Sequence, residues 1–401
     1  MSGERPLNIL ALASYFKGER FMEQAHRRGA RVYLFTQAKL LQKPWPRSSL
    51  VDIFAQPDGS NLEHTLNTVS YLARDLQFDR IVALDDFDVE TAASLREHLR
   101  MPGMGDTTAR HFRDKLAMRV KAREDGIPVP DFVHVLNHQQ IRDFIARTPA
   151  PWMFKPRSEA SATGIIKIEN EAQLWQVMDQ KGDRQSQFLL EKYLPGDVYH
   201  VDSIVTERQV VFQAVNRCGK PPFNVAHGGG IFTSSTVQRG SEDEKALLAL
   251  NQTVLAKLGL VRGVSHVEFI KGREDGKFYM LEAAARVGGA HIADMVEAAT
   301  GINLWEEWAN IEVDGGKKPY VLPKARAEYG GLLVTLAKQE KPDLAPYNDP
   351  EVVYRADEAN HAGLVVRSKE YDRVQQLVSG YQERFIRDFS TFMPAAEKSL
   401  H

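Results

Sequence analysis

Two acidic residues stand in neighbouring apolar runs in the second half of the chain. Glu268 lies within Ser265–Ile270, Glu282 ends Tyr279–Glu282, and a polar turn at 272–276 separates the two runs. In a hairpin built from these runs, the two acids face each other. Opposed carboxylates repel unless a cation lies between them, and Mg²⁺ is commonly held by one or two carboxylates together with substrate phosphates. The pattern therefore predicts a divalent-metal site. The alternative, two solvated acids, is disfavoured because burying an unpaired charge in an apolar run is costly.

A lysine followed by small residues forms a second candidate element, in the segment Phe154–Gly164 (FKPRSEASATG). Small side chains let backbone N–H groups approach phosphate oxygens, and Lys155 would add a point charge. The segment is not the G-x-x-x-x-G-K-[ST] phosphate loop. Taken alone, it suits an ordinary polar hairpin equally well.

Three further segments carry groups that could bind a ligand. Arg286, four residues after Glu282, could hold a carboxylate or a phosphoryl oxyanion with both arms of its guanidinium, or simply form a surface salt bridge. Phe188–Gly196 (FLLEKYLPG) could give an adenine ring a backbone donor and acceptor between apolar walls, although a plain core strand is the simpler interpretation. The glycines of His227–Gly230 suit either a mobile substrate loop or a turn.

Composition excludes several classes of protein. The 401 residues include 51 Lys+Arg and 53 Asp+Glu, so the net charge of −2 argues against a nucleic-acid partner. Cys218 is the only cysteine, which excludes an intrachain disulfide and a Cys-rich zinc site; it is expected as a small residue near a strand end. No stretch approaches the ~18 apolar residues of a membrane span, and the first apolar run, Ile9–Ala13, is too short for a signal peptide. These features predict a cytoplasmic protein without a membrane partner.

The elements expected to position these residues begin with a β-α-β unit. Asn8–Ala13 and Arg31–Thr36 are predicted as strands, with a helix over Glu19–Arg28 between them. Helix, strand and helix follow at 61–76, 80–84 and 89–99. Such alternation predicts a parallel sheet with right-handed crossovers. Because no G-x-G-x-x-G follows the first strand, this domain is not predicted to bind a dinucleotide.

The remainder of the chain is predicted as α+β. Asp106 or Thr107 could cap a helix running to about Glu124, and alternating strands and helices over 132–215 predict one compact unit. Helices are expected at 242–258, 290–298, 304–312 and 371–388, and the acid-bearing strands at 264–270 and 277–284. The fold class is therefore α/β plus α+β, with a division into residues 1–105, 106–200 and 201–401.

Taken in order, these segments resemble the ATP-grasp superfamily over nearly the whole chain, particularly its carboxylate–amine and amino-acid ligase branch, with a core similar to biotin carboxylase. The resemblance rests on Asp114-Lys115, Lys155 with its loop, Glu191–Leu194, Glu268, Glu282 and Arg286. It implies a three-lobed architecture with an N-terminal parallel-sheet domain and with ATP held between two α+β lobes. The implied ATP-binding residues are Lys115 and Lys155 at the phosphates, Ser158, Ser161 and Gly164 in the loop over them, and Glu191, Lys192 and Leu194 at the adenine. The resemblance also implies that Glu268 and Glu282 bind Mg²⁺, with Mn²⁺ as an alternative. It implies Arg286 and Lys155 as the catalytic residues. The implied substrate-binding residues are Arg286, Gly288, Gly289 and His227.

Two positions depart from the family pattern. Ala284 stands where the family often has an Asn, so one metal contact is missing or is supplied by water. Val198 stands where many members have a Glu that binds the ribose hydroxyls; Asp197 and Asp202 are the candidates to replace it.

The resemblance implies an ATP-dependent ligase that phosphorylates a carboxylate and then lets an amine attack the acyl-phosphate, with amino-acid-like substrates. A biotin carboxylase-like subunit is the first alternative, but Val287-Gly-Gly replaces the Gln-Val-Glu stretch of that family. The second alternative is a nucleotide-binding protein with little catalysis, suggested by Ala284 and Val198. The expected partners are a small-molecule carboxylate and amine, and the family's frequent dimers suggest a homodimer.

Overall fold

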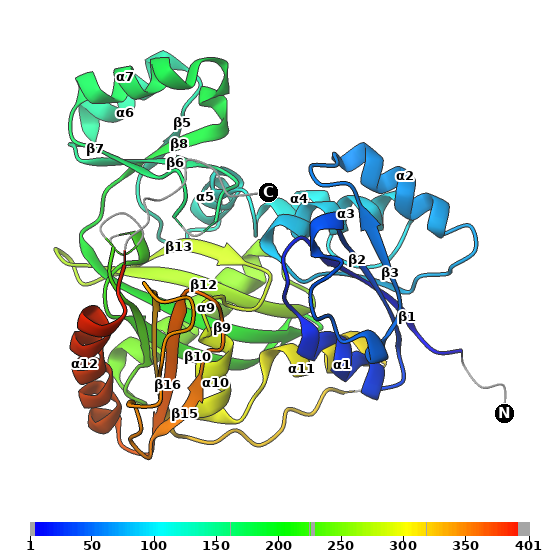
Figure 1. Ribbon diagram of the computed structural model, residues 1–401. Helices are drawn as coiled ribbons and strands as arrows, with labels where there is room; N and C mark the ends of the chain where they lie inside the picture. The colour runs from blue at the N-terminus through cyan, green and yellow to red at the C-terminus, as the bar shows by residue number, and fades with distance from the viewer. Residues whose placement is uncertain (1–4, 161, 224, 226–228, 318, 392–401) are drawn as a thin grey trace.

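The computed structural model describes residues 5–391 apart from 161, 224, 226–228 and 318. Three sheets organise these residues into an N-terminal lobe, a small lobe and a large lobe (Figure 1). The expected α/β plus α+β architecture with an N-terminal parallel sheet is confirmed.

The N-terminal lobe is a four-stranded parallel sheet in the order β3-β2-β1-β4. Its elements are β1 (Asn8–Ala13), α1 (Glu19–Arg27), β2 (Arg31–Gln37), β3 (Leu50–Gln56), α2 (Leu62–Leu72), β4 (Arg80–Ala83) and α3 (Val89–His98). The predicted β-α-β unit is confirmed to within a residue or two. Strand β3 was missed because it lies at the sheet edge, where no residue of the strand is fully buried and no continuous apolar run marks it.

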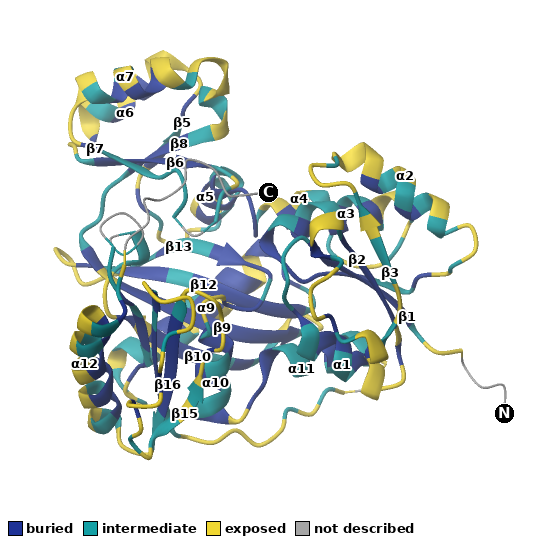
Figure 2. Cartoon of the chain, in the orientation of Figure 1, coloured by how far each residue is buried: buried dark blue, intermediate teal, exposed yellow. Residues whose placement is uncertain are grey.

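The small lobe carries an antiparallel sheet in the order β5-β8-β6-β7. It contains β5 (Phe132–His134), α6 (His138–Arg147), β6 (Trp152–Pro156), β7 (Ile166–Ile168), α7 (Glu171–Lys181) and β8 (Phe188–Lys192). Both helices lie on the side of the sheet away from the large lobe and expose their outer faces to solvent (Figure 2). The other face of this sheet is therefore left to meet the large lobe.

The large lobe is an eight-stranded sheet in the order β13-β12-β9-β10-β11-β14-β16-β15. Its strands are β9 (Gly196–Thr206), β10 (Gln209–Cys218), β11 (Phe232–Thr236), β12 (Gly263–Gly272), β13 (Phe278–Ala284), β14 (Tyr329–Leu336), β15 (Val352–Arg355) and β16 (His361–Ser368). Its helices include α9 (Glu242–Leu258), α10 (Ile292–Thr300), α11 (Leu304–Asp314) and α12 (Tyr371–Asp388).

The structure corrects the expected compact unit over 132–215. Strands β9 and β10 pair with β12 and β11 in the large sheet, not with the small sheet. The expected division at residue 200 therefore cuts through β9, and the change of lobe falls at the Pro-Gly turn that precedes this strand. Local alternation could not distinguish two sheets built from consecutive strands.

The helix expected to run from about 106 to 124 is two helices, α4 (Asp106–Arg110) and α5 (Lys115–Glu124). Gly105, not Asp106 or Thr107, is the residue that precedes α4. Asp114 is the N-cap of α5, and its carboxylate accepts hydrogen bonds from the backbone N–H groups of Leu116 and Ala117. This cap fixes Lys115 as the first residue of the helix, at the entrance to the small lobe.

The N-terminal lobe packs directly on the large lobe. Helices α1 and α11 lie against each other, with the Phe21 and Trp308 rings 5.2 Å apart, and Trp305 packs against the same cluster. Ion pairs join Arg20 to Glu297 and Arg28 to Asp314. Among the described residues, no helix is long and apolar enough to cross a membrane.

Candidate active site

The two acids of the hairpin face each other as predicted. In the antiparallel register of β12 and β13, Glu268 lies opposite Glu282, and a bulge follows immediately. The two side chains are 28% and 31% exposed. Both line a cavity of about 390 Å³ between the small sheet and the large sheet. Two carboxylates side by side at a cavity wall offer the hard oxygen ligands that Mg²⁺ prefers, so the residues present fit this ion.

Each of these carboxylates already has a cationic or hydrogen-bonding neighbour. Lys115 Nζ lies 2.8 Å from Glu282 Oε1 and also donates to the Glu159 carbonyl at 2.6 Å. His266 Nε2 lies 3.6 Å from Glu268 Oε1. Burial alone would raise the pKa of Glu268, but the neighbouring His266 outweighs it and holds that pKa below its usual range. A lysine and a histidine thus relieve the repulsion for which the sequence analysis required a metal.

Lys155 belongs to a buried charge cluster on the small sheet. Its Nζ lies 2.5 Å from Glu191 Oε1, and Arg119 Nε donates to the other oxygen of Glu191 at 2.7 Å. Burial lowers the pKa of Lys155 despite the nearby Glu191. Burial would raise the pKa of Glu191, but Arg119 and Lys155 together hold it below its ordinary value. Glu191 lines the cavity, and its carboxylate holds Lys155 and Arg119 in place.

A buried histidine–aspartate network lies behind the acid pair and was not predicted. Asp202 accepts from His200 Nδ1 at 2.7 Å and from His266 Nδ1 at 2.8 Å. Burial would lower the pKa of His266, but Asp202 outweighs it and raises that pKa to about 9. Asp202 is fully buried, so it cannot serve as the ribose ligand considered above. His266 could have been found, because it stands two residues before Glu268 and therefore on the same face of the strand.

Arg286 lies at the same cavity and is held by the N-terminal lobe. Its Nε donates to Asp86 Oδ2 at 2.7 Å. Asp86 belongs to the acidic segment 85–88, directly after β4. Burial would raise the pKa of Asp86, but the charges of Arg286 and Arg113 outweigh it and keep the pKa low. The N-terminal lobe therefore completes the site by orienting the guanidinium.

Another part of the cavity wall is apolar, and we refer to it as the apolar slot. It is lined by Met153, Ile165, Leu194, Val198, Ile270 and Leu281, with Lys192 at its margin. The segment 192–194 joins β8 to β9, and so links the two sheets that enclose the slot. Such a slot suits a flat heteroaromatic ring. The predicted Lys192 and Leu194 thus both line the cavity, and Val198 contributes an apolar wall.

The loop after β6 is only partly placed as predicted. Ala160, Ala162 and Ile165 line the cavity, whereas Gly164 does not, and Ser158 lines a neighbouring pocket with Arg157. Ser161 lies outside the described residues, as does His227 of the other glycine-rich segment.

Of the remaining predicted site residues, one lines the cavity and two do not. Asp197 is half exposed and paired with Arg217, away from the cavity. Gly289 lines the cavity, with open space where a Cβ would stand. Gly288 does not line it: a Cβ there would come within 2.9 Å of Asp202 Oδ1 and 3.1 Å of His266 Nδ1. The absent side chain of Gly288 therefore makes room for the histidine–aspartate network, not for substrate.

The acidic segment 85–88 also predicts a pH dependence of stability. Burial, with a smaller effect from Asp85, raises the pKa of Asp88 from 3.8 to about 7. Because the folded state binds this proton more tightly, the stabilisation is complete below about pH 4 and is lost as pH rises through 7. The Asp88→Asn variant lacks this loss, so from pH 5 to 8 its free energy of unfolding should rise relative to wild type by about 3 kcal/mol.

Urea unfolding at the two pH values measures this difference. Asp75→Asn, at an exposed position, is the matched control and should follow wild type. If the free energy of unfolding changed equally between pH 5 and pH 8 in wild type and in Asp88→Asn, Asp88 would not titrate in this range.

The fold and the cavity together define a class of protein. Residues 148–294, from the end of α6 into α10, match the family of the ATP-grasp domain. Two sheets that enclose a cavity lined by lysines and paired acids are the arrangement this class implies. Over these residues the chain is similar to the ATP-grasp domain.

Named relatives lie among ligases. The chain is 27% identical to the L-arginine-specific L-amino acid ligase of Bacillus subtilis over 243 residues, 59% of this chain and 58% of that protein. It is 25% identical to the D-alanine–D-alanine ligase of Thermotoga petrophila over 210 residues, 46% of this chain and 64% of that protein. The matches thus span less than two thirds of either relative.

Solved structures share the fold over nearly the full chain. An L-amino acid ligase from Bacillus licheniformis superposes with a TM-score of 0.73 at 17% identity, covering 97% of this chain and 100% of that one. An N5-carboxyaminoimidazole synthetase from Staphylococcus aureus, complexed with ADP, superposes with a TM-score of 0.72 at 15% identity, covering 93% and 96%. At these identities the likeness concerns the fold.

Proposed function

We propose that the protein is an ATP-dependent carboxylate–amine ligase that acts on amino acids. The observation that carries this proposal is the convergence of Lys115, Lys155, Glu268, Glu282 and Arg286 on one cavity. The similarity to two amino-acid ligases supports the substrate class.

Some residues of the cavity position the nucleotide, and others compensate the charge of its phosphates. The apolar slot takes the adenine, and Lys115 and Lys155 lie where they can meet the phosphates. Glu268 and Glu282 would hold Mg²⁺, which screens the charge of the phosphates when bound. The chemistry then depends on placing a carboxylate in line with the γ-phosphorus, so no nucleophilic side chain is required.

Arg286 is the residue we assign to the carboxylate and its acyl-phosphate. Asp86 holds the guanidinium at Nε and the Val287 carbonyl accepts from Nη1 at 2.9 Å, so part of the fork stays available to an anion. The open space at Gly289 leaves room for the reacting group. The amine then attacks the acyl carbon, an amide bond forms, and inorganic phosphate leaves.

The experiment is ADP and phosphate release from the full chain with Mg²⁺ and pairs of L-amino acids, with the products identified by mass spectrometry. We expect release to require an amino acid and to yield a dipeptide mass. Release that requires bicarbonate and free biotin would instead identify a carboxylase. Tight ATP binding without turnover on any pair would identify a nucleotide-binding protein, and either result would overturn the proposal.

A further inference from the structure

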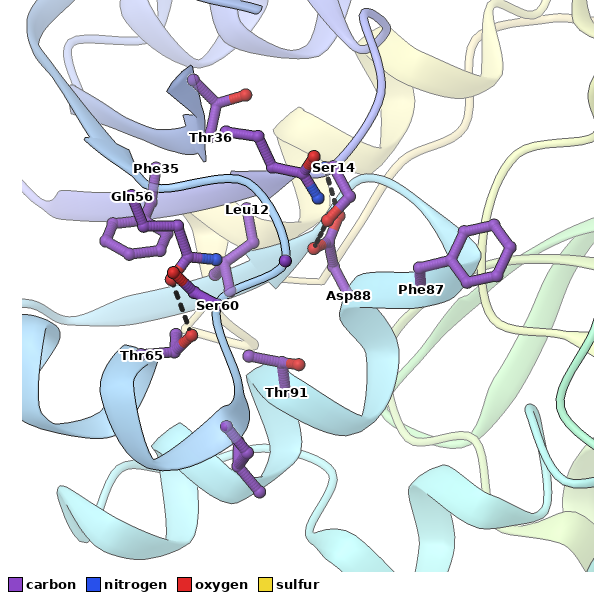
Figure 3. A pocket seen from close by; sticks show the side chains of 13 residues that line it. Leu12, Ser14, Phe35, Thr36, Gln56, Ser60, Thr65, Phe87, Asp88 and Thr91 are labelled. Carbon is purple, nitrogen blue, oxygen red and sulfur yellow. Dashed lines mark hydrogen bonds between the residues drawn. The ribbon is translucent and has the colours of Figure 1, made fainter. Parts of the chain in front are cut away.

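A second cavity, of about 260 Å³, lies in the N-terminal lobe, apart from the cleft between the two other sheets. It opens where the carboxyl ends of β1, β2 and β3 meet the first turns of α2 and α3 (Figure 3). Its lining comprises Leu12, Ser14, Phe35, Thr36, Gln37, Gln56, Gly59, Ser60, Leu62, Thr65, Phe87, Asp88 and Thr91. We refer to it as the N-lobe pocket. The carboxyl edge of a parallel sheet is the usual position of a ligand in open α/β folds.

Hydrogen bonds within the N-lobe pocket hold its polar groups in place. Ser14 donates from its backbone N–H to Asp88 Oδ2 at 2.8 Å and from its hydroxyl to Asp88 Oδ1 at 2.6 Å. Thr65 donates to Gln56 Oε1 at 2.7 Å, across the cavity from Asp88 (Figure 3). The walls are therefore built before any ligand arrives.

Some acceptor atoms in the N-lobe pocket can still take a hydrogen bond. Gln37 Oε1 is buried and has no hydrogen-bond partner among the described residues. Each oxygen of Asp88 retains a second lone pair beyond its bond to Ser14. A buried acceptor without a partner costs free energy, which a ligand carrying N–H or O–H groups would recover.

Charge narrows the chemistry of that ligand. The lining contains one carboxylate, Asp88, and neither lysine nor arginine. A phosphate or a dicarboxylate would find no cation there, whereas an ammonium group would find Asp88 and Gln37. At the other side, α2 begins at Leu62. The Asn61 side chain accepts from the N–H of His64, and the preceding N–H groups of this first turn can donate to a single carboxylate.

The size of the cavity further restricts the ligands that can bind there. With a volume of about 260 Å³, the cavity has room for a small polar amino acid.

We propose that the N-lobe pocket binds a free zwitterionic amino acid of about the size of threonine or asparagine. Its ammonium group lies at Asp88 and its carboxylate at the start of α2. The site is separate from the nucleotide cleft, so it does not depend on the ligase activity proposed above.

Isothermal titration calorimetry on the full chain without nucleotide tests this with L-asparagine as the probe, at pH 8, where Asp88 carries its negative charge. Two analogues isolate its charged groups: succinamic acid lacks the ammonium, and 3-aminopropanamide lacks the carboxylate. Each should bind roughly tenfold or more weakly than L-asparagine, as expected for loss of a charged hydrogen bond. No binding of L-asparagine, or equal binding of either analogue, would overturn the proposal.

Variants locate the site. Asp88→Asn keeps groups that can bond to Ser14 but removes the charge, so L-asparagine should bind roughly tenfold or more weakly. Thr91→Ile narrows the pocket by adding bulk and should also weaken binding. This second variant tests the site even if Asp88→Asn fails to fold. Thr68→Ile, on α2 but outside the lining, is the matched control and should bind as wild type.

Arg286→Lys separates this site from a substrate position in the nucleotide cleft. It should leave binding without nucleotide unchanged if the N-lobe pocket is the site. Binding lost in Arg286→Lys but kept in Asp88→Asn and Thr91→Ile would assign the amino acid to the cleft and overturn the proposal. If the protein showed no ligase activity but still bound L-asparagine in an Asp88-dependent way, this inference would hold and only the proposed function would be overturned.

Discussion

Replacing Glu268 or Glu282 by glutamine should reduce Mg²⁺-dependent ATP turnover by about a thousandfold, a loss of about 4 kcal/mol in transition-state stabilisation. Glutamine keeps the shape of the side chain but removes the negative charge that holds a divalent cation. The two acids face each other across β12 and β13, so neither can be replaced by a neighbour on the same strand. Phosphate release measured against Mg²⁺ concentration gives the result.

The control for these variants lies in the same hairpin. Glu274→Gln removes an acid from the exposed turn and should leave turnover unchanged. Wild-type turnover in Glu282→Gln at every Mg²⁺ concentration would exclude the acid pair as the metal site.

Arg286→Lys should lower the rate of ligation by about a hundredfold to a thousandfold, the usual effect of removing a preorganised donor at a developing charge. Lysine keeps the positive charge but cannot bond to Asp86 and to an anion with one planar fork. We expect ATP binding, followed with a fluorescent nucleotide, to change little, because the slot and the two lysines remain. The loss should therefore fall on kcat.

Asp86→Asn tests whether the N-terminal lobe orients this arginine. If it does, the double variant with Arg286→Lys should lose little more than Arg286→Lys alone, since the two residues act through one bond. Arg217→Lys, in an exposed pair with Asp197, is the control. Losses that simply add would show that Asp86 acts by another route.

The extent of sequence-based prediction varied with the distance between partners in the chain. The register of Glu268 and Glu282 followed from one short hairpin, and Asn8–Ala13 followed from one buried run. Asp86 was not found, because its partner Arg286 lies 200 residues later, in another lobe. Only the position of an acid after a buried parallel strand could have suggested it.

Residues that act through other residues were also missed. Arg119 is one turn after Lys115 on α5 and fully buried, yet an arginine in a helix normally indicates a solvent-exposed face. Its role depends on Glu191, which comes from a strand in the middle of the small sheet. Gly288 was assigned to substrate because a glycine allows close approach, but the sequence does not show which group approaches.

The ion pair between Lys115 and Glu282 has a consequence for the order of events in the cleft. As long as the lysine neutralises this acid, the lysine is not free for a triphosphate. A divalent cation that binds to Glu282 releases Lys115 at the same time. One positive charge then replaces another, and the carboxylates of the hairpin always have a cation beside them. Metal-free nucleotide, in contrast, would have to separate the pair and leave an acid beside its own phosphates. The protein should therefore discriminate strongly between ATP and its magnesium complex before any bond is made.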